Sequence, residues 1–150
     1  MKQRPAENVL ALVHVLSNLI GRAFHGQIVR RHRVALPEWR VLVTLANHPG
    51  STAAHIVERW AMQPMMTSRA IRSLKRRRWI ERRVRHDDRR SYALWLTPKG
   101  RLAYRRVEPH ASMRYRDIVS CLSRKELAAI DRGLVRLVAQ TRRLVRRRSS

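Results

Sequence analysis

The stretch from residue 64 to residue 96 decides the fold; it reads PMMTSRAIRSLKRRRWIERRVRHDDRRSYALWL. Helical spacing of its inward-facing residues predicts a helix from about Pro64 to Arg77. Those residues are Thr67, Ala70, Ile71 and Leu74. Alternation over Ile80–Arg85 and Tyr92–Leu96, with the polar run 86–90 between them, predicts a hairpin. The stretch is therefore expected to form a helix followed at once by a hairpin with a charged tip.

Upstream of this stretch, the sequence predicts two short helices. Pro37 suits the first turn of one helix, where a missing N–H has no cost. The turn at 47–50 ends it, and Ser51 or Thr52 can cap a second helix that runs to Trp60. The residues expected to face the core are Trp39, Val41, Leu42, Leu45, Ile56, Val57 and Trp60. Both helices are thus amphipathic and short.

Longer helices are predicted on both sides of this segment. Apolar residues recur at steps of three and four from about residue 7 to residue 33, in a stripe wide enough for a core and a partner. Thr97 and Pro98 begin a helix that reaches about Val119. Ser123 and Glu126 have capping-box spacing. The apolar seam that follows resembles a short heptad repeat and consists of Leu127, Ile130, Leu134, Leu137 and Leu144, with Thr141.

The charge points to a polyanionic partner. The chain has 34 Lys+Arg against 10 Asp+Glu, a net charge of +24, and such a surface attracts nucleic acid or an anionic membrane. Between Arg69 and Arg90, eleven basic and three acidic residues give +8 in 22 residues. An arginine-rich coding bias with solvated helix faces is the plain alternative. Between Arg69 and Arg90, however, the charge coincides with a predicted helix and a predicted hairpin. Together these segments predict a mainly α (α+β) fold with a winged helix-turn-helix, whose third helix fits the DNA major groove.

Candidate DNA-binding residues follow from this placement. The face of the 64–77 helix opposite its core side carries Ser68, Arg69, Arg72 and Arg76. Arginine suits bidentate contact with guanine, and serine can bind a base or a phosphate. In the hairpin, a carboxylate on Asp88 can orient the Arg90 guanidinium into a narrow minor groove; the alternative is an exposed ion pair that contributes little. The hairpin residues expected to contact phosphates are Arg83, Arg85 and Arg89.

Three motifs resemble the MarR (multiple-antibiotic-resistance regulator) family: MTSRAIRSL at 66–74, Asp88-Arg89-Arg90, and LTPKG at 96–100. Their order and spacing carry the resemblance, which is close from about Leu36 to Leu102; the flanking helices match in pattern and length only. One departure is Arg78-Trp79, where the family commonly has glycine followed by an aliphatic residue. Glycine would allow a left-handed helix end. Because Arg78 makes that conformation costlier, we expect a different exit from the helix.

The resemblance implies a single MarR-type domain over residues 1–150, with a winged helix-turn-helix lobe at about 36–102. It implies that the flanking helices, about 7–33 and 103–148, form a homodimer interface. Such proteins are transcription regulators, here expected to be a cytoplasmic, nucleoid-associated repressor of a palindromic operator in double-stranded DNA. Arg90 would enter the minor groove. The resemblance further implies a small phenolic or lipophilic effector in a cleft between lobe and dimer helices, with residues that the sequence does not identify.

Other chemistry receives little support. Seven histidines include His25 and His32 on the first helix, yet no compact His/Cys/Asp/Glu cluster stands out. We therefore expect no metal and no cofactor; a pH-linked histidine remains open. Cys121 is the only cysteine, which excludes an intrachain disulfide and fits a reducing cytosol. Its neighbours Val119 and Leu122 favour a buried, inert thiol. Trp39 is expected in the core, and by family analogy it could also line the effector cleft.

No apolar run reaches the length of about 18 residues needed for a membrane span, and no membrane partner is expected. Enzymatic activity is not expected either, because a phosphate-binding loop, a nucleophile elbow and a metalloprotease motif are all missing from the sequence. Two rival functions remain. A non-specific, chromatin-like DNA coat would bind with a steep salt dependence and no preferred palindrome. An anionic-membrane protein would use the basic amphipathic terminal helices.

Overall fold

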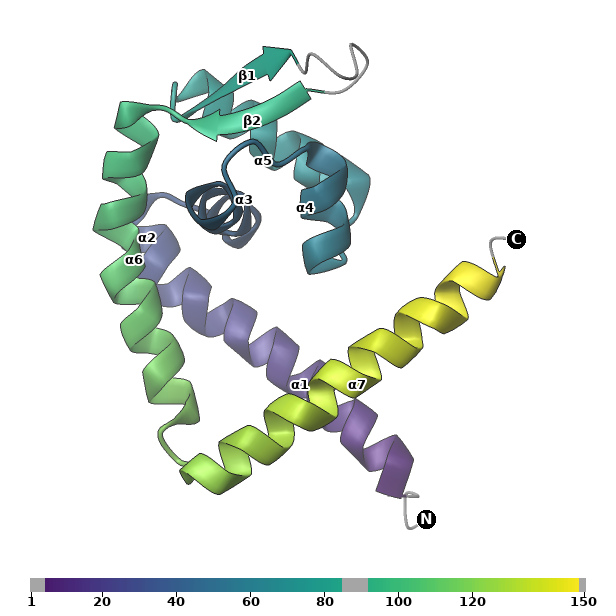
Figure 1. Cartoon of the computed structure of the whole chain (residues 1–150). Coiled ribbons are helices and arrows are strands. Elements are labelled where there is room, and N and C mark those ends of the chain that lie inside the picture. Colours follow the sequence, from purple (N-terminus) through teal and green to yellow (C-terminus); the bar gives the residue numbers. More distant parts are fainter. Residues whose placement is uncertain (1–4, 85–91, 149–150) are drawn as a thin grey trace. The chain divides into compact units, whose positions relative to one another are not determined.

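The computed structural model describes residues 5–84 and 92–148 and confirms the predicted mainly helical winged helix fold. The chain divides into two compact units, Met1–Ser112 and Met113–Ser150. The elements, labelled in Figure 1, are α1 (Pro5–Phe24), the π-helical segment η1 (His25–Val29), α2 (Arg30–His32), α3 (Leu36–Asn47), α4 (Ala53–Trp60), α5 (Pro64–Arg76), β1 (Ile80–Val84), β2 (Tyr92–Leu96), α6 (Pro98–Val119) and α7 (Arg124–Arg148).

Local signals set the ends of the three short helices. Pro37 lies in the first turn of α3, as predicted. Thr52 caps α4, because its hydroxyl oxygen accepts a hydrogen bond from the His55 amide at 3.1 Å. Pro64 opens α5. These signals place α3, α4 and α5 close to the predicted boundaries.

The core of the first unit lies among α3, α4, α5 and the hairpin, which group together in Figure 1. Predicted inward residues that are fully buried include Val41, Leu42, Leu45, Ile56 and Leu74. Trp39 is also buried, and its ring stacks on Tyr104 with 5.4 Å between the centroids. Trp60 is only half-buried, with its indole N–H donating to the Thr44 hydroxyl at 2.9 Å. Both tryptophans therefore hold the lobe together.

The hairpin is fixed at its base. β1 and β2 pair antiparallel, with Ile80 opposite Leu96 and Val84 opposite Tyr92. Leu94 adds backbone hydrogen bonds of 3.0 Å to Gly50 and Ser51, ahead of α4. Gly50 has φ of 82°, and a side chain there would press on Trp95. The turn predicted at 47–50 thus anchors the hairpin to the helices.

The first long helical segment changes environment along its length. From Val9 to Leu19 its apolar side chains are exposed in the single chain, whereas Phe24 and Ile28 are buried. The change coincides with η1, a π-helical insertion of the kind that often occurs at functional positions. The wide stripe seen in the sequence therefore splits into an exposed part and a core part.

Side chains begin both C-terminal helices. Thr97 caps α6, with its hydroxyl accepting from the Gly100 amide at 3.0 Å. Before α7, Ser123 and Glu126 form the predicted capping box: the Ser123 amide donates to the Glu126 carboxylate at 2.8 Å, and the Glu126 amide donates back to the Ser123 hydroxyl at 3.3 Å. In the described ranges, neither these helices nor the others are long and apolar enough to cross a membrane.

Candidate nucleic-acid interface

Helix α5 has one buried face and one basic face. Thr67, Ala70, Ile71 and Leu74 are buried, as predicted from their spacing. The exposed residues of the helix are Pro64, Met65, Met66, Ser68, Arg69, Arg72, Lys75 and Arg76. Packing therefore fixes the helix from behind, while its cationic side chains remain accessible to a ligand.

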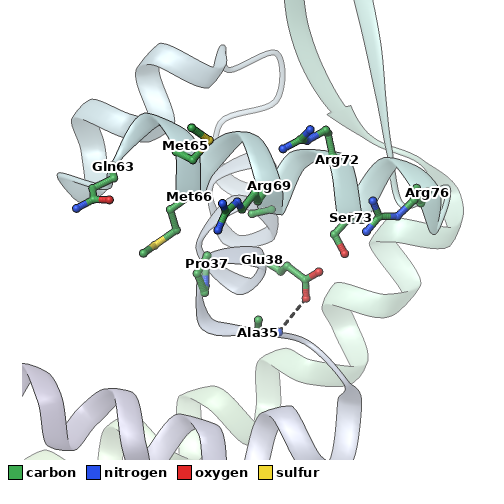
Figure 2. Close-up of a pocket in the computed structure, with 11 residues that line it drawn as sticks. Ala35, Pro37, Glu38, Gln63, Met65, Met66, Arg69, Arg72, Ser73 and Arg76 are labelled. Atoms are coloured by element: carbon green, nitrogen blue, oxygen red, sulfur yellow. Dashed lines mark hydrogen bonds between the residues drawn. The ribbon is translucent and has the colours of Figure 1, made fainter.

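An open cleft of about 660 Å³ runs along one side of this basic face. Figure 2 shows α5 residues on one side of the cleft and Ala35, Pro37 and Glu38 on the other. The α5 side chains that line it include Arg69, Arg72, Ser73 and Arg76. Of the four sequence-predicted residues of this helix, three thus share one wall, whereas Ser68 is exposed outside it.

In the hairpin, the described arginines lie against partners. The Arg83 guanidinium donates to Glu81 Oε1 at 2.6 and 3.0 Å and lies 4.8 Å from the centre of the Trp95 ring. Arg82 lies 4.7 Å from the Tyr92 ring. These contacts direct both cations along the hairpin surface. The other predicted hairpin residues, Arg85, Asp88, Arg89 and Arg90, lie outside the described residues.

The backbone that follows α5 differs from the sequence-based expectation. Arg78 adopts the left-handed conformation, with φ of 58°, although a different exit was expected without glycine. The helix ends in a Schellman motif: the Arg78 amide donates to the Lys75 carbonyl at 2.9 Å, and the Trp79 amide donates to the Leu74 carbonyl at 3.0 Å. The Arg78 carbonyl also accepts from the Thr97 hydroxyl at 2.7 Å. These hydrogen bonds hold arginine in a conformation that glycine would adopt at lower cost.

Two histidines meet in the first unit. The ring centroids of His32 and His110 are 4.9 Å apart, and the buried Nε2 atom of His32 has no hydrogen-bond partner among the described residues. Burial, with added repulsion from His110 and Arg31, lowers the pKa of His32 below its ordinary value of 6.5. Across residues 5–84 and 92–148, no group of three or more His, Cys, Asp or Glu could hold a metal ion.

Cys121 was expected to be buried, and this expectation is wrong for the single chain. The residue is exposed in the turn between α6 and α7, where its thiol lies 3.7 Å from the Ile118 carbonyl. Its apolar neighbours suggested a packed site. A two-helix turn, however, has no covering element of its own, so the thiol faces outward.

Sequence reasoning missed one cluster beside the basic face. Arg77 contacts Glu38 and the carbonyl of Arg33, 44 residues earlier. Glu38 is buried at 6% exposure, and its carboxylate accepts from the Ala35 amide. A glutamate three residues after the N-cap is a known helix signal, but Ala35 lacks the usual Ser or Thr side chain. The long-range contact to Arg77 has no signal in the sequence.

The fold and the basic helix define a protein of the winged helix-turn-helix class. Residues 34–91 match the model MarR_2, described as MarR family. This match confirms the resemblance to the MarR family found in the sequence. No curated protein sequence matches the chain.

Solved structures of MarR-type regulators share the fold. A MarR/EmrR family transcriptional regulator from Acinetobacter sp. ADP1 has 18% sequence identity and a TM-score of 0.85, covering 94% of this chain and 99% of its own. Bordetella bronchiseptica BpsR, whose DNA binding is regulated by 6-hydroxynicotinic acid, has 22% identity and a TM-score of 0.77 (87% and 98% covered). S. aureus MepR, solved as a DNA complex, has 20% identity and a TM-score of 0.76 (87% and 96%).

Proposed function

We propose that the protein is a sequence-specific transcription regulator that binds double-stranded DNA as a homodimer. In this proposal it acts in the cytoplasm, on the nucleoid, as a repressor at a palindromic operator. One observation carries the proposal: α5 has its apolar face fixed in the core and its arginine-bearing face exposed. A rigid helix of this kind fits the major groove and can read base edges there. The MepR–DNA complex supports the choice of ligand, since MepR has the same fold.

Each DNA-binding residue has a proposed role. Ser68, Arg69 and Arg72 read bases in the major groove, and Arg76 extends the same face. Arg83 contacts a phosphate after leaving Glu81, an exchange with a small cost because the pair is exposed. The remaining proposed contacts come from the hairpin tip: Arg85 and Arg89 to phosphates, and Arg90, held by Asp88, to the minor groove.

Exposed apolar side chains support the homodimer. Along α7, the seam residues Leu127, Ile130, Leu134 and Leu137 are 38–44% exposed in the single chain. Helix α1 carries a further exposed stripe from Val9 to Leu19. Contiguous apolar surface of this kind marks an interaction site. A second copy of the chain offers an equally apolar surface to cover it.

The proposal includes release from DNA by a small phenolic or lipophilic ligand. BpsR, with the same fold, is regulated by 6-hydroxynicotinic acid. That compound is therefore a suitable first probe in a DNA-release titration with a panel of other aromatic acids. Release by none of them would contradict this part of the proposal and leave DNA binding standing.

Selection of bound sites from random duplex DNA tests the central claim. The salt concentration should be about 0.15 M, which screens loose electrostatic attraction. We expect an inverted repeat with half-sites about one helical turn apart. Tight binding without an enriched sequence would instead support the non-specific DNA coat suggested by the +24 charge. That outcome would contradict base reading by Arg69 and Arg72.

A point substitution tests the assignment of α5. Arg72→Ala should weaken binding to the selected duplex by about 1–3 kcal/mol and relax specificity at one base position. The matched control is Arg132→Ala, which removes the same charge from an exposed position on α7. An equal loss on every DNA sequence would place Arg72 among the phosphate contacts.

A further inference from the structure

Arg77, directly after α5, makes contacts unlike those of its neighbour Arg76. The Arg76 side chain is exposed and lines the cleft along the basic face. Arg77 Nη1 donates to the Arg33 carbonyl at 2.6 Å, and Nη2 lies 3.7 Å from a carboxylate oxygen of Glu38. Two adjacent arginines therefore have different surroundings: one faces solvent, and the other joins α5 to residues 33–38, here called the joint segment.

The joint segment is itself tightly specified. Arg33 has φ of 52°, a left-handed conformation that ends α2, and the next residue, Val34, is fully buried. Glu38 Oε2 accepts from the Ala35 amide at 2.8 Å (Figure 2). One carboxylate therefore caps α3 and also faces Arg77. A buried carboxylate is costly without a cationic or hydrogen-bonding partner, so the Arg77 contact supports this geometry.

Arg77 also contacts the far side of the α5 exit. Its guanidinium carbon lies 5.0 Å from the centre of the Trp79 ring. The Trp79 carbonyl in turn accepts from the Thr97 amide at 3.0 Å, where α6 begins. The Arg77 side chain thus links the end of α5 to the joint segment and, through Trp79, to Thr97 at the start of α6.

We propose that Arg77 is a positioning residue: it sets the orientation in which α5 meets DNA, without contacting DNA itself. This inference rests on the proposed function. Its physical basis is that the guanidinium fixes the last turn of α5 against the joint segment, which connects the lobe to α1, η1 and α2. A loosened joint would let the basic face rotate away from the geometry that reads bases.

Salt dependence distinguishes positioning from direct contact. A plot of log K against log salt has a negative slope, and each lost phosphate contact reduces the magnitude of that slope by about 0.9. Arg76→Ala is the matched comparison, because it removes the same side chain one residue earlier. We expect Arg77→Ala to weaken binding to the selected duplex by roughly 2- to 30-fold with an unchanged slope. A slope reduced in magnitude by about 0.9, or an unchanged affinity, would overturn the proposal.

Arg77→Lys separates geometry from charge. Lysine keeps the positive charge but lacks the planar fork that reaches two acceptors at once. We expect Arg77→Lys to lose affinity for the selected duplex while its binding to a scrambled duplex stays at the wild-type level. Full retention of affinity by the lysine variant would show that charge alone matters and would contradict positioning.

Hydrogen exchange tests the joint without DNA. The Ala35 amide, which donates a hydrogen bond to Glu38, should exchange faster in Arg77→Ala than in Arg76→Ala. Amides in the core of α3 should exchange alike in both variants. Equal exchange at Ala35 would contradict the proposed joint. If the wild-type protein selects no DNA sequence, the proposed function fails, and this measurement still decides whether Arg77 holds the joint segment.

Discussion

The lobe and helix α7 use the same apolar spacing with opposite results. In the lobe, residues at steps of three and four on α3 and α5 are almost completely buried. On α7, Leu127, Ile130, Leu134 and Leu137 recur at the same steps and remain 38–44% exposed. An amphipathic stripe gains stability only where another element covers it. The lobe supplies its own cover within one chain, and α7 requires cover from elsewhere.

Helix α1 shows the same contrast within one element. Leu16 and Leu19 are about half exposed, while Phe24 is 1% exposed and its ring lies 6.4 Å from that of Trp39. Substitutions in the buried apolar region and in the exposed apolar region should therefore have different effects. The substitutions below test that difference, beginning with the largest expected effect.

The largest effect is expected for Gly100→Ala in the lobe. A Cβ on Gly100 would overlap the backbone carbonyl of Trp79, which cannot move without breaking the α5 exit. We expect the free energy of unfolding in urea to fall by about 3 kcal/mol. Gly133→Ala on α7 is the matched control, because among the described residues a Cβ there has no neighbour within 4 Å beyond the backbone of its own helix. The control should be neutral or gain up to about 1 kcal/mol from helix propensity; equal effects of the two alanines would contradict the contrast.

The next effect concerns the uncovered helix. Leu134→Glu on the α7 seam should weaken the proposed dimer, since covering one leucine contributes about 1.5–3 kcal/mol. Sedimentation velocity should show a shift toward the monomer, with the near-UV circular dichroism of the lobe unchanged. Arg136→Gln makes the same change in charge on the opposite side of the helix and should leave the dimer intact. A monomeric wild-type chain would contradict the proposed dimer.

A smaller effect of opposite sign is expected for Arg78→Gly. Glycine adopts the left-handed conformation without the Cβ penalty that Arg78 incurs, although it loses more entropy on folding. The net gain in the free energy of unfolding should be about 0.5–1 kcal/mol. Lys75→Gly, three residues earlier within α5, should instead lose about 1 kcal/mol. A loss in both variants would mean that the Arg78 side chain contributes contacts worth more than its backbone strain.

The smallest effect is a pH dependence from His32. Because its pKa is lowered in the folded chain, the unfolded chain binds more protons between that lowered value and 6.5. The free energy of unfolding should therefore fall as the pH decreases through this window. The contribution of neutral His32 to stability should be fully present above pH 6.5. Urea midpoints measured at pH 7.5 and pH 5 should differ less in His32→Gln than in the wild type. An unaltered difference would assign the pH dependence to other groups.

Much of the lobe could be predicted because its signals are local. Pro64, Thr52 and Thr97 mark helix starts, and the spacing of Thr67, Ala70, Ile71 and Leu74 identifies the buried face of α5. The exposed arginines follow from that face. The DNA-binding roles themselves remain predictions.

The features that sequence reasoning missed depend on distant or backbone contacts. Arg78 was expected to avoid a left-handed helix end, but hydrogen bonds from Thr97 and within the Schellman motif stabilise it. The exposure of Cys121 depends on what covers a turn, which hydropathy does not encode. The contact between Arg77 and the joint segment spans 44 residues, and a pattern of local spacing contains no information about it.

The π-helical segment η1 changes the direction in which the α1 side chains point relative to the residues that follow it. A π turn accommodates an extra residue, and one residue corresponds to about 100° of rotation in an α-helix. If residues 25–29 were regular α-helix with every residue retained, the α1 stripe would therefore turn by nearly a third of a circle against the lobe, whereas deleting a single residue between His25 and Val29 would restore a regular helix and leave the direction of the stripe unchanged. A substitution that regularised this turn without removing a residue would therefore redirect the exposed stripe even where every apolar residue is retained.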